Sequence, residues 1–314
     1  MSPQTLHDVL SRYPAGYAPK AWKSLGDSAG FSGAEIVRIE TELGSFCLRG
    51  WPARSLPAER ILGLHCLLSH VFQAGLQEVP VPVPARNGET LLAWNGQYWQ
   101  LEPWMPGQAD FWSHPSPPRL RDVMSRLALF HQLTRDYADC GSARNWFFHE
   151  DQAHSPAVLE RLAYLNQWKH TKIHLLRAAL ATETQAALHE MGREFASRFD
   201  RVANSLGMKL EWLSRVKFSL QPCLRDLWHD HVLYTGEKVT GLIDASACRG
   251  ENVATDLARL LGSLLMDDRA AWALALTEYE QHRPLDAHER ALLDALDQSA
   301  GFSYRDWPGW IGSS

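Results

Sequence analysis

The chain has 314 residues, of which 45% are hydrophobic and 21% are charged, so it is long enough for about two lobes and too apolar for general disorder. A formal net charge of −5 argues against nucleic-acid binding as its main activity. No segment is apolar enough to span a bilayer, and the N-terminus lacks the features of a signal peptide. Five cysteines without paired or metal-ligand spacing predict reduced thiols. We therefore expect a cytoplasmic protein with no membrane or nucleic-acid partner.

The N-terminal third of the chain has the pattern of a β-sheet with one helix. Residues 34–51 form a predicted hairpin, AEIVRIETE, a turn and FCLRGW. Apolar residues at helical spacing predict a helix over 59–75, which Gly75 ends. Two more strands, 90–94 and 98–101, are joined by Asn95-Gly96, a dipeptide typical of hairpin turns.

Two features of this third are suited to phosphate binding. The loop Gly26–Gly33 consists of small residues whose backbone N–H groups can approach a phosphate, although an ordinary hairpin loop accounts for it better. Arg49 follows the apolar run Phe46–Leu48 on a predicted strand, where it is either a phosphate-binding cation or a surface residue of an edge strand.

The segment Glu102–Gly107 ends the sheet pattern with two prolines and a glycine, and helices follow it. We therefore predict an α+β protein with a β-rich lobe over residues 1–102 and a mainly helical lobe over 103–314. We expect Trp307 and Trp310 to anchor the C-terminal tail on the helical lobe. The predicted helices of that lobe are 119–134, 156–180, 183–206, 253–266, 268–282 and 286–299.

The stretch Leu224–Asp244, LRDLWHDHVLYTGEKVTGLID, carries the most chemistry. Two short apolar runs, 231–234 and 239–243, flank a turn-prone segment and predict a β-hairpin. Pairing of Tyr234 with Val239 would place His231 opposite Leu242. Asp226, His231 and Asp244 would then share one space at the open end of the hairpin, which suits a divalent metal and a general base.

The order of these features resembles the aminoglycoside phosphotransferase and choline kinase-like family, whose members are related to protein kinases. The family's catalytic loop, His-Gly-Asp-Leu-His-Pro-Gly-Asn, matches Leu224-Arg225-Asp226-Leu227-Trp228-His229-Asp230-His231. The strand ending in the family's second metal-binding aspartate matches Val239–Asp244, and a later Asp-Leu-Ala matches Asp256–Ala258. The resemblance spans roughly residues 20–270 and implies a two-lobed, protein-kinase-like fold.

The resemblance also implies roles for individual residues. Asp226 would act on the substrate hydroxyl, Asp244 and His231 would bind metal, and Asp256 would brace the catalytic loop. His231 replaces the family's asparagine, and Leu224 replaces its leading histidine. Because imidazole is a softer ligand than an amide oxygen, His231 would shift preference from Mg²⁺ toward Mn²⁺ or Zn²⁺, or would instead hydrogen-bond a phosphate.

In the β-rich lobe the resemblance places Arg49 where the family has a phosphate-binding lysine. The helix over 59–75 has Leu64 and His65 where a glutamate partner for that cation is expected, and Glu59 is an alternative more than one turn earlier. The segment Leu101–Met105 matches the hinge, so the backbone around Glu102, Trp104 and Met105 would hold adenine.

Taken together, these features predict an ATP-dependent phosphotransferase that uses Mg²⁺, or Mn²⁺ because of His231, and acts on a hydroxyl of a small molecule such as a sugar, amino alcohol or aminoglycoside. One alternative is an inactive kinase-like module that binds nucleotide. Another is a metal-dependent phosphohydrolase with ligands from Trp228–His231, in which His229 and His231 share one strand face. It would need further histidines, and the available ones are His149, His154 and the pair His170 and His174, for which solvent exposure is the commoner explanation.

Overall fold

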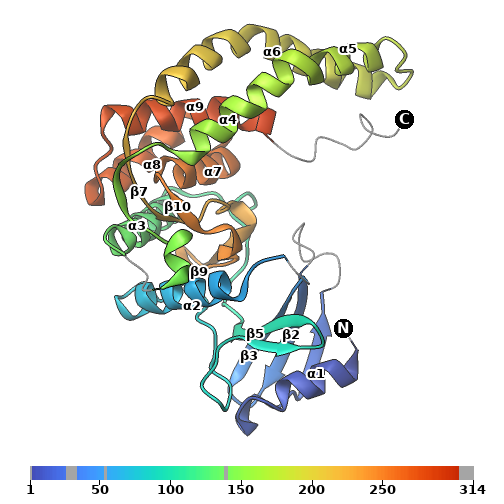
Figure 1. Ribbon diagram of the computed structural model, residues 1–314, viewed down its shortest axis with the longest axis vertical. Coiled ribbons are helices and arrows are strands. Elements are labelled where there is room, and N and C mark those ends of the chain that lie inside the picture. The colour runs from blue at the N-terminus through green and yellow to red at the C-terminus, as the bar shows by residue number, and fades with distance from the viewer. Residues whose placement is uncertain (1, 26–33, 53–54, 138–140, 304–314) are drawn as a thin grey trace.

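The computed structural model describes residues 2–25, 34–52, 55–137 and 141–303. The loop Gly26–Gly33 and the tail residues Trp307 and Trp310 therefore lie outside the described residues, and the expectations for them stay open. Within the described ranges an antiparallel sheet forms one end of the molecule and helices form the other (Figure 1). The predicted α+β fold class is confirmed.

The five-stranded sheet contains the strands predicted from the N-terminal third. Its order is β1-β2-β3-β5-β4, and every neighbouring pair is antiparallel. Arg49 lies on β3 opposite Gln100 of β5, while Cys47 lies opposite Glu102. The strands are β1 (Ala21–Ser24), β2 (Glu35–Thr41), β3 (Gly44–Trp51), β4 (Leu92–Trp94) and β5 (Gln97–Pro103).

The N-terminal helix covers one face of this sheet. Helix α1 (Pro3–Leu10) begins with Ser2, whose hydroxyl accepts the backbone N–H of Thr5, and with a proline at the first helical position. Its apolar face packs with Tyr13 against the sheet residues Val37, Ile39, Leu48, Trp99 and Leu101. The sheet thus has a core of its own.

The predicted helix over 59–75 is confirmed as α2 (Ala58–Gln73), but its apolar face does not belong to the sheet core. Leu64, Leu67, Leu68 and Val71 pack instead into the large core of the helical region. Helix α2 accordingly lies between the sheet and the helices in Figure 1. It therefore places any side chain on its sheet-facing side at the junction of the two regions.

Helices build most of the rest, and each predicted helix has a counterpart. A π-helical turn, Trp168–Lys172, interrupts the stretch predicted over 156–180, and the next helix extends to Leu213. These helices are α3 (Pro117–Thr134), α4 (Pro156–Gln167), α5 (Ile173–Leu180), α6 (Ala186–Leu213), α7 (Ala254–Leu265), α8 (Arg269–His282) and α9 (Ala287–Ser303).

Two small sheets frame the predicted catalytic loop. Strands β6 (Glu150–Ala153), β7 (Phe218–Cys223) and β10 (Arg249–Glu251) form one, with β7 in the middle. Strands β8 (Val232–Thr235) and β9 (Lys238–Leu242) form the predicted hairpin. The loop between β7 and β8 therefore leaves the first small sheet and enters the hairpin.

The predicted register of the hairpin is right at one end and wrong at the other. Tyr234 pairs with Val239, as expected, but Val232 rather than His231 lies opposite Leu242. The ladder shifts at Thr240, an extra residue on β9, which is the arrangement of a β-bulge. The Thr240 hydroxyl donates to the carbonyl of Pro106, so the bulge serves a contact with the segment after β5.

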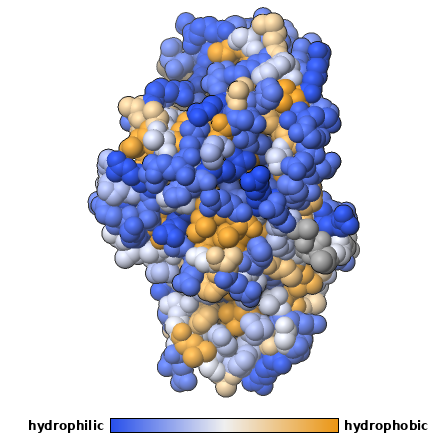
Figure 2. Space-filling view, turned by 90° about the vertical axis from the view of Figure 1, so that its left-hand side faces the viewer, coloured by the Kyte–Doolittle hydropathy of each residue, from blue (hydrophilic) through white to orange (hydrophobic). Residues whose placement is uncertain are grey.

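The surface is mixed in character. On the face shown in Figure 2, hydrophilic residues cover most of the helical end, and hydrophobic residues gather near the middle of the molecule. Within the described residues, none of the helices has the length and apolar composition needed to cross a membrane.

Candidate active site

The loop between β7 and β8 presents Asp226 to solvent. Its side chain is 47% exposed, and Oδ1 accepts a hydrogen bond of 2.9 Å from Nε of Arg259 on α7. The preceding residue, Arg225, has a φ of 64°, in the left-handed region that non-glycine residues rarely adopt. The loop therefore turns sharply just before the carboxylate, and the guanidinium of Arg259 orients that carboxylate. Sequence reasoning missed Arg259.

Buried Asp256 holds the backbone of this turn. Its two carboxylate oxygens accept the N–H groups of Leu224 and Arg225 at 2.7 Å and 2.5 Å. His131 lies 3.1 Å from the same carboxylate and also contacts the Tyr279 hydroxyl. Burial lowers the pKa of His131 although Asp256 opposes this effect. The bracing role that the resemblance implied for Asp256 agrees with this geometry.

His231 uses both ring nitrogens. Nε2 lies 3.0 Å from the indole N–H of Trp228, and since that group can only donate, Nε2 must be the unprotonated nitrogen. Nδ1 therefore carries the proton and donates to the backbone carbonyl of Asp226 at 2.8 Å. A backbone carbonyl on one ring nitrogen is the usual second contact of a metal-ligating histidine, because it fixes the tautomer whose other nitrogen has the lone pair.

Asp244 follows β9 directly and faces this lone pair. Its Oδ2 lies 3.9 Å from Nε2 of His231, and its Oδ1 lies 3.2 Å from Nη1 of Arg49. Burial acts to raise the pKa of the Asp244 carboxyl, but the Arg49 guanidinium together with other contacts, among them hydrogen bonds from Ser246, holds the pKa below the ordinary value. Asp244 also has a φ of 56°, so a second strained residue marks the site.

The residues around Asp244 fit a divalent cation. Two ligand atoms on one ion with bonds of ~2.1 Å lie about 3 to 4 Å apart, and the 3.9 Å between Oδ2 and Nε2 falls within that span. The carboxylate is ionised and the imidazole tautomer is correct for binding through Nε2. The indole N–H of Trp228 occupies the lone pair that a metal would use, so metal binding requires this hydrogen bond to break.

Arg49 is paired with strand residues rather than with a helix glutamate. Its Nε lies 3.6 Å from Oε1 of Glu102, and both side chains are buried. Glu59, the alternative considered from the sequence, is exposed on α2. Arg49 is therefore not the surface residue of an edge strand: β3 lies between β2 and β5, and the guanidinium lies between two carboxylates.

The segment predicted to hold adenine continues from β5. Pro103 has no backbone N–H, and the N–H of Trp104 donates to the carbonyl of Ser45. Within the described ranges the N–H of Met105 has no hydrogen-bond partner. Met105 is thus the donor that this segment can offer to a ligand, whereas Glu102 contributes its side chain to Arg49.

The geometry does not favour the phosphohydrolase hypothesis. His229 and His231 lie in a short 3-10 turn, so the expectation that they share a strand face was wrong. His170 and His174 are exposed, as anticipated. Among the residues that the structure describes, one group of three side chains has the spacing of metal ligands, namely His131, Cys223 and Asp256, and Asp256 already accepts the loop N–H groups.

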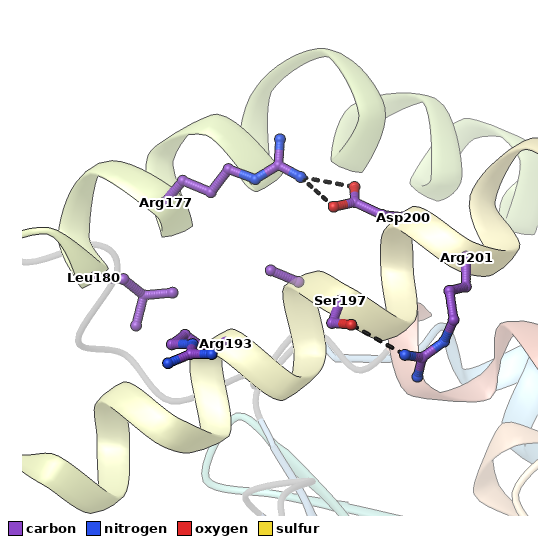
Figure 3. A pocket seen from close by; sticks show the side chains of 7 residues that line it. Arg177, Leu180, Arg193, Ser197, Asp200 and Arg201 are labelled. Carbon is purple, nitrogen blue, oxygen red and sulfur yellow. Dashed lines mark hydrogen bonds and ion pairs between the residues drawn. The ribbon is translucent and has the colours of Figure 1, made fainter.

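One cavity of the described part lies away from this site. It measures about 670 Å³ and is lined by residues of α5 and α6, at the end of the molecule opposite the five-stranded sheet (Figures 1 and 3). Arg177 and Asp200 form an ion pair across it, and Arg201 donates to Ser197. No residue of the loop around Asp226 lines this cavity, so it contributes nothing to the candidate site.

Comparison with known proteins agrees with this geometry. The chain is 24% identical over 305 residues to a homoserine kinase of Rhodopseudomonas palustris (strain ATCC BAA-98 / CGA009), covering 95% of this chain and 81% of that protein. It is 23% identical over 303 residues to a homoserine kinase of Sinorhizobium medicae (strain WSM419), covering 95% and 82%.

Solved structures share the fold at low identity. An aminoglycoside phosphotransferase from Alicyclobacillus acidocaldarius superposes with a TM-score of 0.71 at 17% identity, over 100% of this chain and 88% of the other. Spectinomycin phosphotransferase in complex with ADP and spectinomycin superposes with a TM-score of 0.70 at 11% identity, over 96% of this chain and 86% of the other. A microcompartment-associated aminopropanol kinase superposes with a TM-score of 0.63 at 15% identity, over 99% of this chain and 92% of the other. The predicted protein-kinase-like fold is thus confirmed.

The model of the phosphotransferase enzyme family matches residues 25–293, a range that includes β2, the loop around Asp226 and all of α7 and α8. This match covers more than half of the chain and agrees with the resemblance found in the sequence. The chain therefore belongs to the phosphotransferase enzyme family and is a phosphotransferase of the kinase type.

Proposed function

We propose that this protein transfers the γ-phosphoryl group of ATP to a hydroxyl of a small polar molecule. The observation that carries the proposal is the convergence of Asp226, His231, Asp244 and Arg49 from three separate parts of the chain. Arg49 contacts Asp244, Asp244 faces His231, and His231 bonds the backbone of Asp226. In-line phosphoryl transfer needs mainly positioning and charge neutralisation, which such a set supplies.

Each group has a proposed role. Asp226, half exposed and oriented by Arg259, would orient the acceptor hydroxyl and accept its proton. Arg49 would contact the nucleotide phosphates. The N–H of Met105, next to Trp104 and close to Glu102, would meet adenine. Residues 1–102 would thus form the lobe that holds the nucleotide, and residues 103–314 would supply the catalytic loop.

Asp244 and His231 would hold the metal. A divalent ion at this place would neutralise charge on the phosphates, which is its usual contribution to phosphoryl transfer. Mg²⁺ prefers oxygen ligands, while Mn²⁺ accepts imidazole more readily. We therefore propose that both ions support activity and that Mn²⁺ binds more tightly.

The acceptor is proposed to be a small hydroxylated amine or amino acid. Homoserine kinases are sequence relatives, and an aminopropanol kinase shares the fold. The structures of spectinomycin and aminoglycoside phosphotransferases keep larger sugars among the candidates to be tested.

The test is ATP consumption over homoserine, amino alcohols, sugars and aminoglycosides with Mg²⁺ or Mn²⁺. We expect turnover with at least one acceptor and a loss of about 10²-fold or more in kcat for Asp226→Asn, as for removal of a general base. Asp230→Asn is the matched control, since Asp230 is an exposed aspartate of the same loop that contacts His229.

Other outcomes would contradict the proposal. Nucleotide binding without turnover would identify an inactive kinase-like module. Hydrolysis of a phosphoester without ATP, lost in Asp230→Asn, would identify a hydrolase.

A further inference from the structure

Arg49, the proposed phosphate-binding cation, is paired with a hydrogen-bond network that extends from the five-stranded sheet to α2. Arg49, Gln100 and Glu102 lie on the neighbouring strands β3 and β5, and His65 reaches them from α2. Their exposed fractions are 9% for Arg49, 3% for Gln100, 6% for Glu102 and 3% for His65. Polar groups this deeply buried are costly unless they are hydrogen-bonded, so their arrangement is specific.

The direction of every hydrogen bond in the network follows from one donor. The indole N–H of Trp51 can only donate, so the Gln100 atom 2.7 Å away is the amide oxygen. His65 Nε2, 2.9 Å from the same oxygen, must then donate as well, and Nδ1 accepts from the Thr90 hydroxyl at 2.8 Å. The amide nitrogen of Gln100 is thereby turned toward Glu102 and donates to Oε2 at 2.6 Å.

Glu102 lies between a hydrogen-bond donor and a cation, an arrangement that suits an ionised carboxylate. Oε2 accepts from Gln100, and Oε1 faces Nε of Arg49 at 3.6 Å. Burial raises the pKa of the Glu102 carboxyl, and the Arg49 charge opposes this shift. Burial likewise disfavours the charge on Arg49, but Glu102 and Asp244 outweigh it and raise the pKa of the guanidinium.

The anchor at Nε decides which part of Arg49 faces the site. A guanidinium is planar, so fixing Nε against Glu102 directs its terminal nitrogens to the side of Asp244, where Nη1 lies 3.2 Å from Oδ1. Among the described residues, Arg49 forms ion pairs with Glu102 and Asp244, so without Glu102 its remaining ion pair would be with Asp244. The same arginine would then compete more strongly with a metal for Asp244.

We infer that Glu102, supported by Gln100 and His65, is the positioning residue for Arg49 and takes the place of a glutamate on α2. This inference rests on the proposed nucleotide site. The cation and its anchor lie on adjacent strands of one sheet, and α2 contributes to their pairing through His65 rather than through a glutamate. Glu102 keeps Arg49 available to phosphates and Asp244 available to metal.

The experiment compares Glu102→Gln with Glu59→Gln, which removes the exposed acid of α2 by the same substitution. Binding of Mn²⁺–ADP is measured by calorimetry, and KM for ATP is measured separately from kcat. For Glu102→Gln we expect affinity for Mn²⁺–ADP to fall about tenfold or more and KM to rise, with a smaller change in kcat. Glu59→Gln should match the wild type.

A double-mutant cycle shows whether Glu102 acts through Arg49. In an Arg49→Met background, Glu102→Gln should cause no further loss of Mn²⁺–ADP affinity. An equal loss in both backgrounds would overturn the inference, as would wild-type affinity in the single variant.

Stability is followed by thermal unfolding, because removing a buried carboxylate also affects folding. Gln100→Leu keeps the charges of Glu102 and Arg49 but removes the amide group that donates a hydrogen bond to Glu102. Like Glu102→Gln, it should weaken nucleotide binding. If both variants melt lower with unchanged Mn²⁺–ADP affinity, the network is purely structural and the inference fails. If the wild type itself binds no nucleotide, the proposed function fails first.

Discussion

His231 stands where the resemblance places the asparagine of the family, and its two hydrogen bonds define its chemical state. Nδ1 donates to the carbonyl of Asp226, and Nε2 accepts from Trp228. The imidazole is therefore neutral and already in the tautomer that binds metal through Nε2. The indole N–H of Trp228 competes for that lone pair, and this contact exists only in the folded loop.

Replacement of Trp228 by phenylalanine should strengthen metal binding. The Trp228→Phe side chain keeps an aromatic ring beside Arg259 but cannot donate to Nε2. Since a typical hydrogen bond contributes about 0.5–1.5 kcal/mol, we expect Mn²⁺ to bind roughly twofold to tenfold more tightly in the presence of ADP. Mn²⁺ titration followed by electron paramagnetic resonance measures this change.

The matched control is Trp212→Phe on α6, where the indole is exposed. It should leave Mn²⁺ affinity unchanged. Equal affinity of Trp228→Phe and the wild type would show that His231 does not bind the metal through Nε2.

At the scale of elements, the segment after β5 is attached to the β8–β9 hairpin. Gln108 and Tyr234 exchange two backbone hydrogen bonds of 2.9 Å, and the bulged Thr240 donates to Pro106. Gly107 sits between these contacts with a φ of 102°, and a Cβ there would lie 2.6 Å from the carbonyl oxygen of Tyr234. This attachment positions the Met105 N–H relative to the strand that leads to Asp244.

A Gly107→Ala substitution should therefore destabilise the protein and weaken nucleotide binding. The side chain would meet the hydroxyl of Thr240 as well as the backbone carbonyl of Tyr234, and because that backbone cannot rotate away, the segment must move away from the hairpin. Left-handed strain and the clash each cost about 1–3 kcal/mol, and we expect a loss of ~3 kcal/mol in the free energy of unfolding. Urea denaturation measures it.

Gly88→Ala is the control that separates backbone strain from steric clash. Gly88 has a φ of 84°, but a Cβ added there would have no neighbouring atom within 4 Å, so only the backbone strain applies. A loss equal to that of Gly107→Ala would show that the close approach to Tyr234 is unimportant.

At the scale of the whole molecule, two buried neutral histidines link the sheet and the helical core to pH. Burial lowers the pKa of His65 to about 4, and burial also lowers that of His131. Below pH 6.5 the unfolded chain binds protons that the folded protein does not. The free energy of unfolding therefore falls as pH decreases from 6.5 toward the lower pKa of the folded state.

The contribution of His65 is measurable by substitution. Between pH 7 and pH 5 the unfolding free energy of the wild type should fall by ~2 kcal/mol more than that of His65→Gln. The reason is that pH 5 lies 1.5 units below the ordinary histidine pKa of about 6.5, and each pH unit of proton uptake by the unfolded chain alone costs about 1.4 kcal/mol. Urea denaturation at both pH values gives the difference, and His170→Gln, at an exposed histidine, is the control. Identical pH dependence of wild type and His65→Gln would contradict a buried neutral His65.

The sequence by itself determined the elements and the candidate loop. Hydrophobic periodicity, turn residues and caps act over a few neighbours, so α2, α3, α7 and the β8–β9 hairpin could be predicted. The spacing of Asp226 and Asp244 was likewise sufficient to suggest the family. One signal in the sequence also pointed to the network: Gln100 and Glu102 are polar residues two apart, on either side of the apolar Leu101, and on a strand they share one face.

Only the tertiary structure decided which polar groups meet. Arg49 and Asp244 are 195 residues apart in the chain, and Arg259 lies 33 residues from Asp226. The bulge at Thr240 moved His231 by one position from its predicted partner. Such pairings depend on how distant segments pack and on which buried groups need a partner, and these are properties of the folded molecule rather than of local sequence.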